Sequence, residues 1–163
     1  MADVTRKAAG LTAAVAASLA IAMPVGDALT LKWEGVKLAP YLDSVKIWTV
    51  CRGETQILMR VYTRQECDAI YRRRFRDDYM IPIYRCVPQL ADRPKIWGAS
   101  GSLAYNIGVT AFCRSSAARF FGARQWAAGC DTFPRWNKAG GRVIRGLSNR
   151  RIDERQVCIA GAA

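Results

Sequence analysis

The 163-residue chain contains no histidine and few acidic residues. The absence of histidine excludes Ser-His-Asp and Cys-His nucleophiles, and it excludes zinc sites that use histidine ligands. Catalysis therefore has to come from carboxylates, hydroxyls, Lys, Tyr or Cys. Because Asp and Glu together number 13, the search for a catalytic carboxylate is short. The sequence indicates neither a metal site nor a cofactor.

Closely spaced cysteine pairs are also missing, since no C-x-x-C occurs. This spacing argues against clustered zinc or iron–sulfur ligation. An even number of cysteines behind an export-like N-terminus favours disulfides and a compartment outside the cytoplasm, with the pairing left open. Six reduced cysteines in the core are the alternative. The cysteines are Cys51, Cys67, Cys86, Cys113, Cys130 and Cys158.

Basic residues outnumber acidic ones, 25 to 13, which gives a formal charge of +12. Such a charge attracts polyanions, whether nucleic acid, anionic lipid or an acidic cell-wall polymer. The run RRRFR at 72–76 is the nearest candidate for a nucleic-acid site, but it has no interleaved aromatic pattern and falls in a helical stretch that exposes its arginines. We therefore expect no nucleic-acid partner. The length predicts one domain, which we expect to be a monomer.

An Ala-rich uncharged segment, residues 8–26, follows Arg6 and Lys7 and precedes Asp27. About twenty residues can span a bilayer, yet Ala, Gly, Ser and Thr dominate, so insertion should be only weakly favourable. We predict that residues 1–26 form a releasable membrane anchor, oriented with its basic end inside, and that residues 27–163 form the functional domain. Two alternatives stay open: a signal peptide cleaved after Ala22, and a plain buried helix.

The remaining pattern predicts a mostly helical α+β chain with one small β element near its start. The β-branched and aromatic residues between positions 41 and 55 indicate a hairpin. Thr63 and Glu66 form a capping box for a helix, and Gly108 is a natural stop for another. Pro82 and Pro88 predict an irregular stretch. Helical patterns cover residues 27–34, 64–79, 94–107, 115–121 and 125–133, with a last helix from Ser148 as N-cap and a staple of Leu147 with Ile152.

Glu34, Asp43 and Thr49 stand in an E-x8-D-x5-T arrangement, where a helix, a turn and a strand can bring them to one cleft. Glycoside hydrolysis needs a protonated acid and a second group that directs water or attacks carbon. Asp43 beside Ser44 should stay ionised, and the Thr49 hydroxyl could hold water. A pair of solvated surface acids is the competing interpretation. Apolar neighbours are expected to raise the pKa of Glu34; they are Leu31, Trp33 and Leu38.

The stretch EGVKLAPYLDSVKIWTVCRGET resembles the active-site segment of the phage-type lysozymes, or endolysins. Three later blocks, AYNIGVTAF, FPRWNKAGG and GLSNRRIDERQVC, resemble the same family in the same order. With the N-terminal segment, the chain is similar to the signal-anchor-release subgroup. The resemblance implies a lysozyme-like fold, with a small N-terminal β lobe and a helical C-terminal lobe. It also implies hydrolysis of the β-1,4 bond between N-acetylmuramic acid and N-acetylglucosamine in peptidoglycan, leading to host cell lysis.

The resemblance also implies roles for individual residues. Glu34 would be the general acid, and Asp43 and Thr49 would position or activate water, with inversion at the anomeric carbon. Tyr105, Asn106 and Ser115 fall where the family contacts saccharide. For Asn106 and Ser115, capping of a helix end is the alternative.

Some positions depart from the family's pattern. Lys46 stands where relatives have a turn glycine, and Glu54 replaces the histidine of a Gly-His-Thr motif. Cys86 and Cys113 are extra to the common cysteine pattern, so we predict that they pair with each other.

The connection between the anchor and Glu34 suggests a form of control. While residues 8–26 lie in the inner membrane, Glu34 would be held at its periplasmic surface and away from Asp43; release would fold the segment onto the domain in the periplasm. No cysteine precedes Cys51, so the thiol exchange of some relatives is not available. Other hypotheses are a secreted lysozyme with a cleaved signal, a basic membrane-disrupting protein, and a wall-binding module without catalysis.

Overall fold

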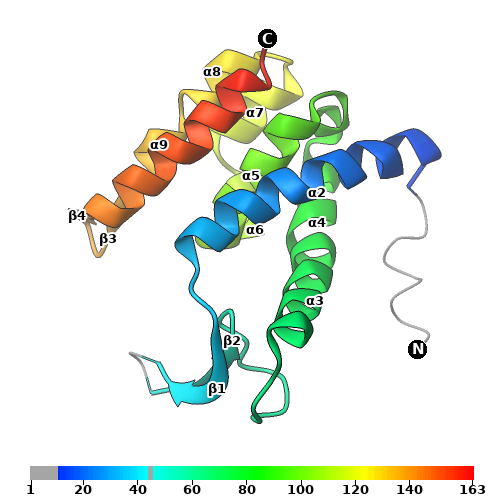
Figure 1. The fold of residues 1–163 in the computed structure, drawn as a ribbon. Helices are drawn as coiled ribbons and strands as arrows, with labels where there is room; N and C mark the ends of the chain where they lie inside the picture. The colour runs from blue at the N-terminus through cyan, green and yellow to red at the C-terminus, as the bar shows by residue number, and fades with distance from the viewer. Residues whose placement is uncertain (1–10, 44–45) are drawn as a thin grey trace.

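The computed structural model describes residues 11–43 and 46–163, and its first labelled helix is α2, Ala13–Trp33 (Figure 1). Thr12 caps this helix, because its side chain accepts a hydrogen bond from the amide of Val15. The helix ends at Glu34, whose amide bonds to the carbonyl of Thr30. Residues 27–33 thus continue the apolar segment as one helix, and residues 8–10 lie outside the described part of the chain. By length and composition α2 could cross a membrane, with a mean hydropathy of 1.7.

In the folded domain α2 packs along α5, Pro94–Ile107 (Figure 1). Small residues allow the close approach of the two helices. A Cβ atom on Gly98 of α5 would lie 2.6 Å from the carbonyl oxygen of Ala22, and one on Gly26 would lie 2.7 Å from the ring of Phe75. The buried stripe of α2 is Ser18, Leu19, Ala22, Gly26, Leu29 and Thr30.

The predicted hairpin is present as strands β1, Lys37–Leu42, and β2, Trp48–Cys51, which pair antiparallel. The first strand begins earlier than position 41 and contains Pro40. A register shift between Lys37 and Tyr41 accommodates this proline, which has no amide to donate to the ladder. The hairpin belongs to a small lobe below the helices (Figure 1), with its own buried cluster of Val50, Cys51, Tyr62 and Cys67.

The capping box of Thr63 and Glu66 starts helix α3, Arg64–Arg74, as predicted. The helical run then continues through a π-helical segment, Phe75–Met80, into α4, Ile81–Cys86. The expectation of an irregular stretch at Pro82 was therefore wrong. Pro82 occupies the first turn of α4, directly after the wider π-helical turns, where its missing amide costs little.

The helical lobe continues with short helices behind α5. Pro94 begins α5 and Gly108, at φ 89°, ends it, as predicted. The helix predicted over 125–133 is shorter, and a two-stranded turn at Gly140 and Gly141 was not predicted. The further elements are α6 Val109–Cys113, α7 Ser116–Gly122, α8 Trp126–Cys130, a 3₁₀ turn Phe133–Arg135, β3 Lys138–Ala139, β4 Arg142–Val143 and α9 Arg145–Ala160. A 3₁₀ helix, Pro88–Asp92, precedes α5.

Helix α9 begins at Arg145, so the prediction of an N-cap at Ser148 was wrong. The Ser148 hydroxyl donates to the carbonyl of Ile144, one turn back, instead of accepting from an amide at the helix start. Ile152 is 52% exposed, so the hydrophobic staple proposed for it with Leu147 does not anchor the helix start.

All six cysteines form disulfides, which confirms the expectation of an oxidised protein. One bond joins the hairpin to α3, one joins α4 to α6, and one joins α8 to α9. The second is the pair predicted between the two extra cysteines. The bonds are Cys51–Cys67, Cys86–Cys113 and Cys130–Cys158.

Candidate active site

Glu34 lies immediately after the last turn of α2, at the junction of the two lobes. Its Oε1 accepts a hydrogen bond from Nη1 of Arg150 at 2.6 Å. The carboxyl side chain is 31% exposed, whereas the arginine is buried. We expected apolar side chains around this carboxyl, from Leu31, Trp33 and Leu38. Arg150, which contacts the carboxyl most directly, was not predicted.

A buried network of charges on α9 holds Arg150 in place. Glu154, fully buried, accepts hydrogen bonds from Nε of Arg150 at 3.1 Å and from the hydroxyl of Ser102 on α5 at 2.7 Å. Arg151 forms a second ion pair with Glu154, at 2.8 Å. Burial raises the pKa of the Glu154 carboxyl above its usual range, and the two arginines oppose that shift. A residue so bound in a packed interior presents its guanidinium to Glu34 in one geometry.

The end of α2 is bound to α9 through three consecutive residues. Lys32 and Trp33 both contact the carboxylate of Asp153, with Nζ at 2.6 Å and Nε1 at 3.1 Å. Glu34 then meets Arg150, one turn earlier on the same helix. The position of the Glu34 side chain thus depends on α2 being packed against the domain.

Asp43 and Thr49 belong to the hairpin. Oδ1 of Asp43 accepts a hydrogen bond from the amide of Ile47 at 2.8 Å, which fixes the carboxylate within the turn. Thr49 is buried, and its hydroxyl donates to the carbonyl of Ile47 at 3.0 Å. Lys46 adopts φ 62°, so it takes the left-handed conformation that the family's glycine would supply. Ser44 lies outside the described residues.

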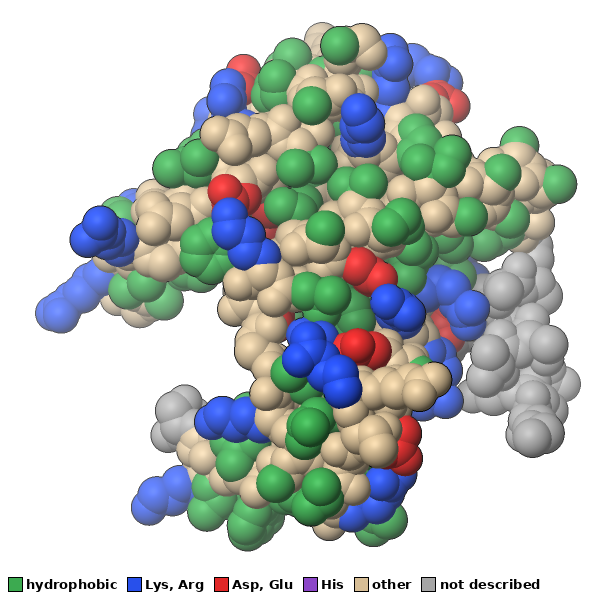
Figure 2. Space-filling model, in the orientation of Figure 1, with side chains coloured by type: hydrophobic (Ala, Val, Ile, Leu, Met, Phe, Trp, Pro, Cys, Tyr) green, Lys and Arg blue, Asp and Glu red, His purple; other side chains and the backbone are tan. Residues whose placement is uncertain are grey.

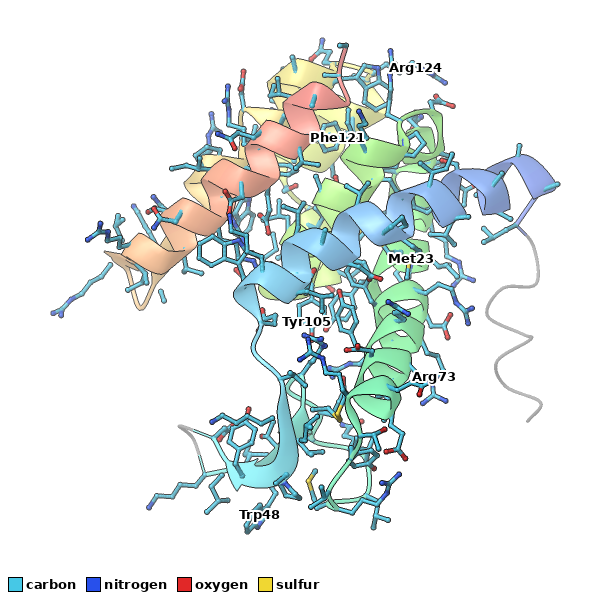
Figure 3. The ribbon with its side chains drawn as sticks, viewed as in Figure 1. Met23, Trp48, Arg73, Tyr105, Phe121 and Arg124 are labelled. Carbon is cyan, nitrogen blue, oxygen red and sulfur yellow. A yellow bond between two sulfur atoms is a disulfide. The ribbon has the colours of Figure 1, made fainter. Side chains whose placement is uncertain are left out.

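The two lobes meet at Arg52 and Tyr105. Arg52 is buried, and its guanidinium lies 3.5 Å from the carbonyl oxygen of Glu34 and 2.7 Å from Oδ1 of Asp68 on α3. The Tyr105 hydroxyl donates to the carbonyl of Arg52 at 3.1 Å, and Figure 3 shows this tyrosine between α2 and the hairpin lobe. In the space-filling view (Figure 2) the molecule is hollowed on one side, between the hairpin lobe and the start of α9. A polymer could enter this hollow.

The predicted saccharide-binding residues are dispersed. The Tyr105 hydroxyl is engaged by the hairpin, and Asn106 is exposed near the end of α5. Ser115 caps α7, because its hydroxyl accepts from the amide of Ala118 at 3.2 Å, and it also lines an open cavity of about 370 Å³. Capping is therefore realised for Ser115, and contact of all three residues with saccharide stays a prediction.

Glu54 occupies the position of the histidine in the family's Gly-His-Thr motif. Its buried carboxylate accepts a hydrogen bond from Nη1 of Arg74 at 2.8 Å, so it binds the hairpin lobe to α3. Arg72 similarly pairs with Asp27 of α2, at 3.3 Å. Two arginines of the run at 72–76, Arg72 and Arg74, therefore form ion pairs within the protein.

Sequence reasoning missed the residues that support the acid, above all Arg150, Glu154 and Arg52. One signal was available: an arginine and a glutamate four residues apart on a predicted helix can form a pair. Among the residues that the structure describes, no group of acids and cysteines could hold a metal ion. The site therefore offers carboxylates, a threonine hydroxyl and fixed guanidinium groups.

A lysozyme-like fold that carries the Glu34 carboxyl at the end of α2, where the two lobes meet, is typical of a class of glycoside hydrolase. The family model for phage lysozyme matches residues 31–154, and the chain belongs to this family. It is 36% identical to the SAR-endolysin of Enterobacteria phage P21 over 133 residues, which are 78% of each chain. Among solved structures, the active form of the P1 phage endolysin Lyz superposes with a TM-score of 0.75, at 22% identity, over 91% of this chain and 95% of that one. The secreted inactive form of Lyz superposes with a TM-score of 0.52, at 19% identity, over 90% and 96%.

Proposed function

We propose that this lysozyme hydrolyses the β-1,4 bond between N-acetylmuramic acid and N-acetylglucosamine in peptidoglycan. Glu34 protonates the glycosidic oxygen as the bond to the anomeric carbon breaks. Asp43 and Thr49 direct a water molecule to the opposite face of that carbon, and the product has inverted configuration. Tyr105, Asn106 and Ser115 contact the saccharide, and the +12 charge favours an anionic wall polymer.

The observation that carries this proposal is the setting of Glu34. The carboxyl is partly exposed at the junction of the two lobes, while Arg150 binds it and Arg52 contacts the carbonyl of the same residue. An acid that acts on a bound polymer needs both access and a fixed geometry. The carboxylate of Glu66 is also held, by Arg60 and by the amide of Thr63, but it serves as the cap of α3 and does not lie where the lobes meet.

We further propose that the inner membrane controls this activity. Helix α2 is long and apolar enough to span a bilayer, and its small residues make it a weak anchor. In the folded domain the same small residues let α2 lie close to α5. The SAR-endolysin relatives and the likeness to the active form of Lyz support the same interpretation. The protein would be exported, tethered facing the periplasm, and then released there as a monomer.

A cleaved signal peptide fits the structure less well. Cleavage after Ala22 would remove Leu19 and Ala22, which are both buried in the main core. It would also remove Ser18, whose hydroxyl donates to the carbonyl of Ala91 at 2.7 Å. The intact mass of the periplasmic protein decides between the two: a loss of residues 1–22 would exclude the anchor.

Turnover of purified peptidoglycan by a Glu34→Gln variant tests the enzymatic proposal. Loss of a general acid costs about a hundredfold or more in rate, so release of reducing ends should fall at least that far. Glu66→Gln is the matched control, because glutamine can still complete the capping box, and it should retain the full rate. Unchanged turnover by Glu34→Gln would contradict the assigned role. Continued killing of cells without turnover would indicate membrane disruption instead.

A further inference from the structure

The exposed large hydrophobic side chains of the described residues are concentrated in the hairpin lobe. Trp48 is 55% exposed and Leu58 is 73% exposed, which is unusual for side chains of this size in a folded domain. Figure 2 shows hydrophobic side chains gathered over the lower end of this lobe, with basic side chains beside them. We call these residues the hairpin surface: Leu38, Leu42, Trp48, Leu58 and Val61.

The hairpin surface is distinct from the candidate active site. Leu42 pairs with Trp48 across the strands, and Tyr41 pairs with Thr49. Because successive side chains of a strand point to opposite faces, Trp48 and Leu42 lie on the face opposite Thr49. Figure 3 shows Trp48 at the far lower end of the molecule, below β1 and away from the helical lobe. Substrate bound beside Thr49 would leave this face uncovered.

The loop that follows β2 extends the same surface. The amide of Tyr62 donates to the carbonyl of Leu38 at 2.9 Å, so this loop runs beside β1. The loop carries Leu58 and Val61, the two most exposed members of the hairpin surface. Two separate segments of the chain therefore contribute apolar side chains to one lobe.

The charges around the hairpin surface identify the kind of partner. Lys37 and Lys46 are exposed in the hairpin, and Arg60 is exposed in the loop. Among the acids of this lobe, Glu54 is buried and paired with Arg74, and Glu66 is paired with Arg60. Asp43 is bound within the turn by the amide of Ile47. Tryptophan and aliphatic side chains with lysines at their edge suit the headgroup region of an anionic bilayer.

The order of the chain strengthens this identification. Helix α2, which could span a membrane, ends at Trp33, and β1 begins at Lys37. The hairpin surface thus starts within a few residues of a membrane-compatible helix. We infer that the hairpin surface docks the folded, released domain peripherally on an anionic phospholipid bilayer. The lysozyme would then remain beside the membrane after α2 has left it, with its cleft free for the wall.

Co-sedimentation of the full-length released protein with vesicles tests this inference. Vesicles contain phosphatidylglycerol with phosphatidylcholine, or phosphatidylcholine alone. The wild type should bind the anionic vesicles more tightly, and added salt should weaken that binding. Trp48→Ser, and separately Leu58→Ser with Val61→Ser, should each lower the partition coefficient about tenfold. Because every variant keeps α2, the difference reports on the hairpin surface.

Val143→Ser is the matched control, since Val143 is 59% exposed in the other lobe, and it should bind like the wild type. Glu34→Gln should also bind normally, so failure of this inference and failure of the catalytic proposal can be told apart. If Trp48→Ser does not fold, the loop variant decides. Equal vesicle binding by the loop variant and the wild type would overturn the inference. Loss of binding to peptidoglycan sacculi with vesicle binding intact would also overturn it, and would make this a wall-binding surface.

Discussion

The support of the Glu34 carboxyl comes from residues distant in the sequence. Arg150 contacts Glu34 at one end and Glu154 at the other, and its second terminal nitrogen lies 3.3 Å from the carbonyl of Ser102. A lysine could not serve these partners at once, because its ammonium is a single point on a flexible stem. We therefore assign Arg150 the role of a positioning residue for the Glu34 carboxyl.

Replacing Arg150 with Met should lower both activity and stability. Glu34 would lose its fixed orientation, and the buried Glu154 would lose one of two arginine partners, which costs about 3 kcal/mol. We expect a lower kcat at nearly unchanged KM on soluble peptidoglycan fragments, and a changed pH profile of kcat. Arg155 lies on the same helix as Arg150, and Arg155→Met removes only its exposed ion pair with Asp131, so this variant should change neither kcat nor the pH profile. A wild-type kcat and pH profile in folded Arg150→Met would contradict the positioning role.

Among the elements, α2 combines two properties. It is long and apolar enough to cross a membrane, and its small residues let it lie close to α5. Docking then carries Lys32, Trp33 and Glu34 to their partners on α9. Weakening the packing of α2 should therefore reduce activity without any change at the site itself.

Gly98→Ala tests this dependence. The new Cβ would lie 2.6 Å from the carbonyl oxygen of Ala22, so α2 has to shift, at a cost of about 1–3 kcal/mol. Urea unfolding should show that loss, and peptidoglycan turnover should fall with it. Gly122→Ala is the control, because no atom would lie within 4 Å of its Cβ. Full turnover by Gly98→Ala, despite a displaced α2, would show that activity does not depend on the packing of α2 against α5.

Asp27, on α2, makes the stability of the folded protein depend on pH. Burial raises the pKa of its carboxyl, although Arg72 acts in the opposite direction. Since the folded pKa lies above the unfolded value of about 3.9, the stability linked to the protonated form is complete below that value and is lost as the pH rises through the folded pKa. Asp27→Asn should therefore gain thermal stability relative to wild type between pH 3 and pH 7. Asp131→Asn, at an exposed ion pair, should show no such gain; a pH-independent difference for Asp27→Asn would refute the argument.

Element prediction succeeded where a local signal ends or begins a helix. The capping box at Thr63, and Pro94 with Gly108, set boundaries that the structure keeps. It failed at Pro82, because π-helical turns let a proline continue a helix. It also failed at Ser148, where the hydroxyl bonds within the helix. Helix α9 starts directly after β4 and has no side-chain cap, so no capping signal marks its first residue.

For the whole molecule, the sequence predicted the two lobes and the helix, turn and strand that carry Glu34, Asp43 and Thr49, because these elements are consecutive. That the three side chains act together in one cleft stays a prediction. The network around Arg150 and Glu154 was not predictable. The sequence of α9 is rich in charged residues, which is typical of an exposed helix, and these two side chains become buried only when α2 and α5 pack against α9. The Cys86–Cys113 pair was predicted, whereas the pairing of the other four cysteines depends on which elements meet in space.

We propose that helix α2 both anchors the protein and places its acid. The decisive measurement is lysis of cells that express the full chain, with wild type and Glu34→Gln compared before and after the membrane is depolarised. We expect intact cells before depolarisation, rapid lysis by wild type afterwards, and no lysis by Glu34→Gln at either stage. Lysis by wild type while the protein still sediments with the membrane, or equal lysis by Glu34→Gln, would contradict it.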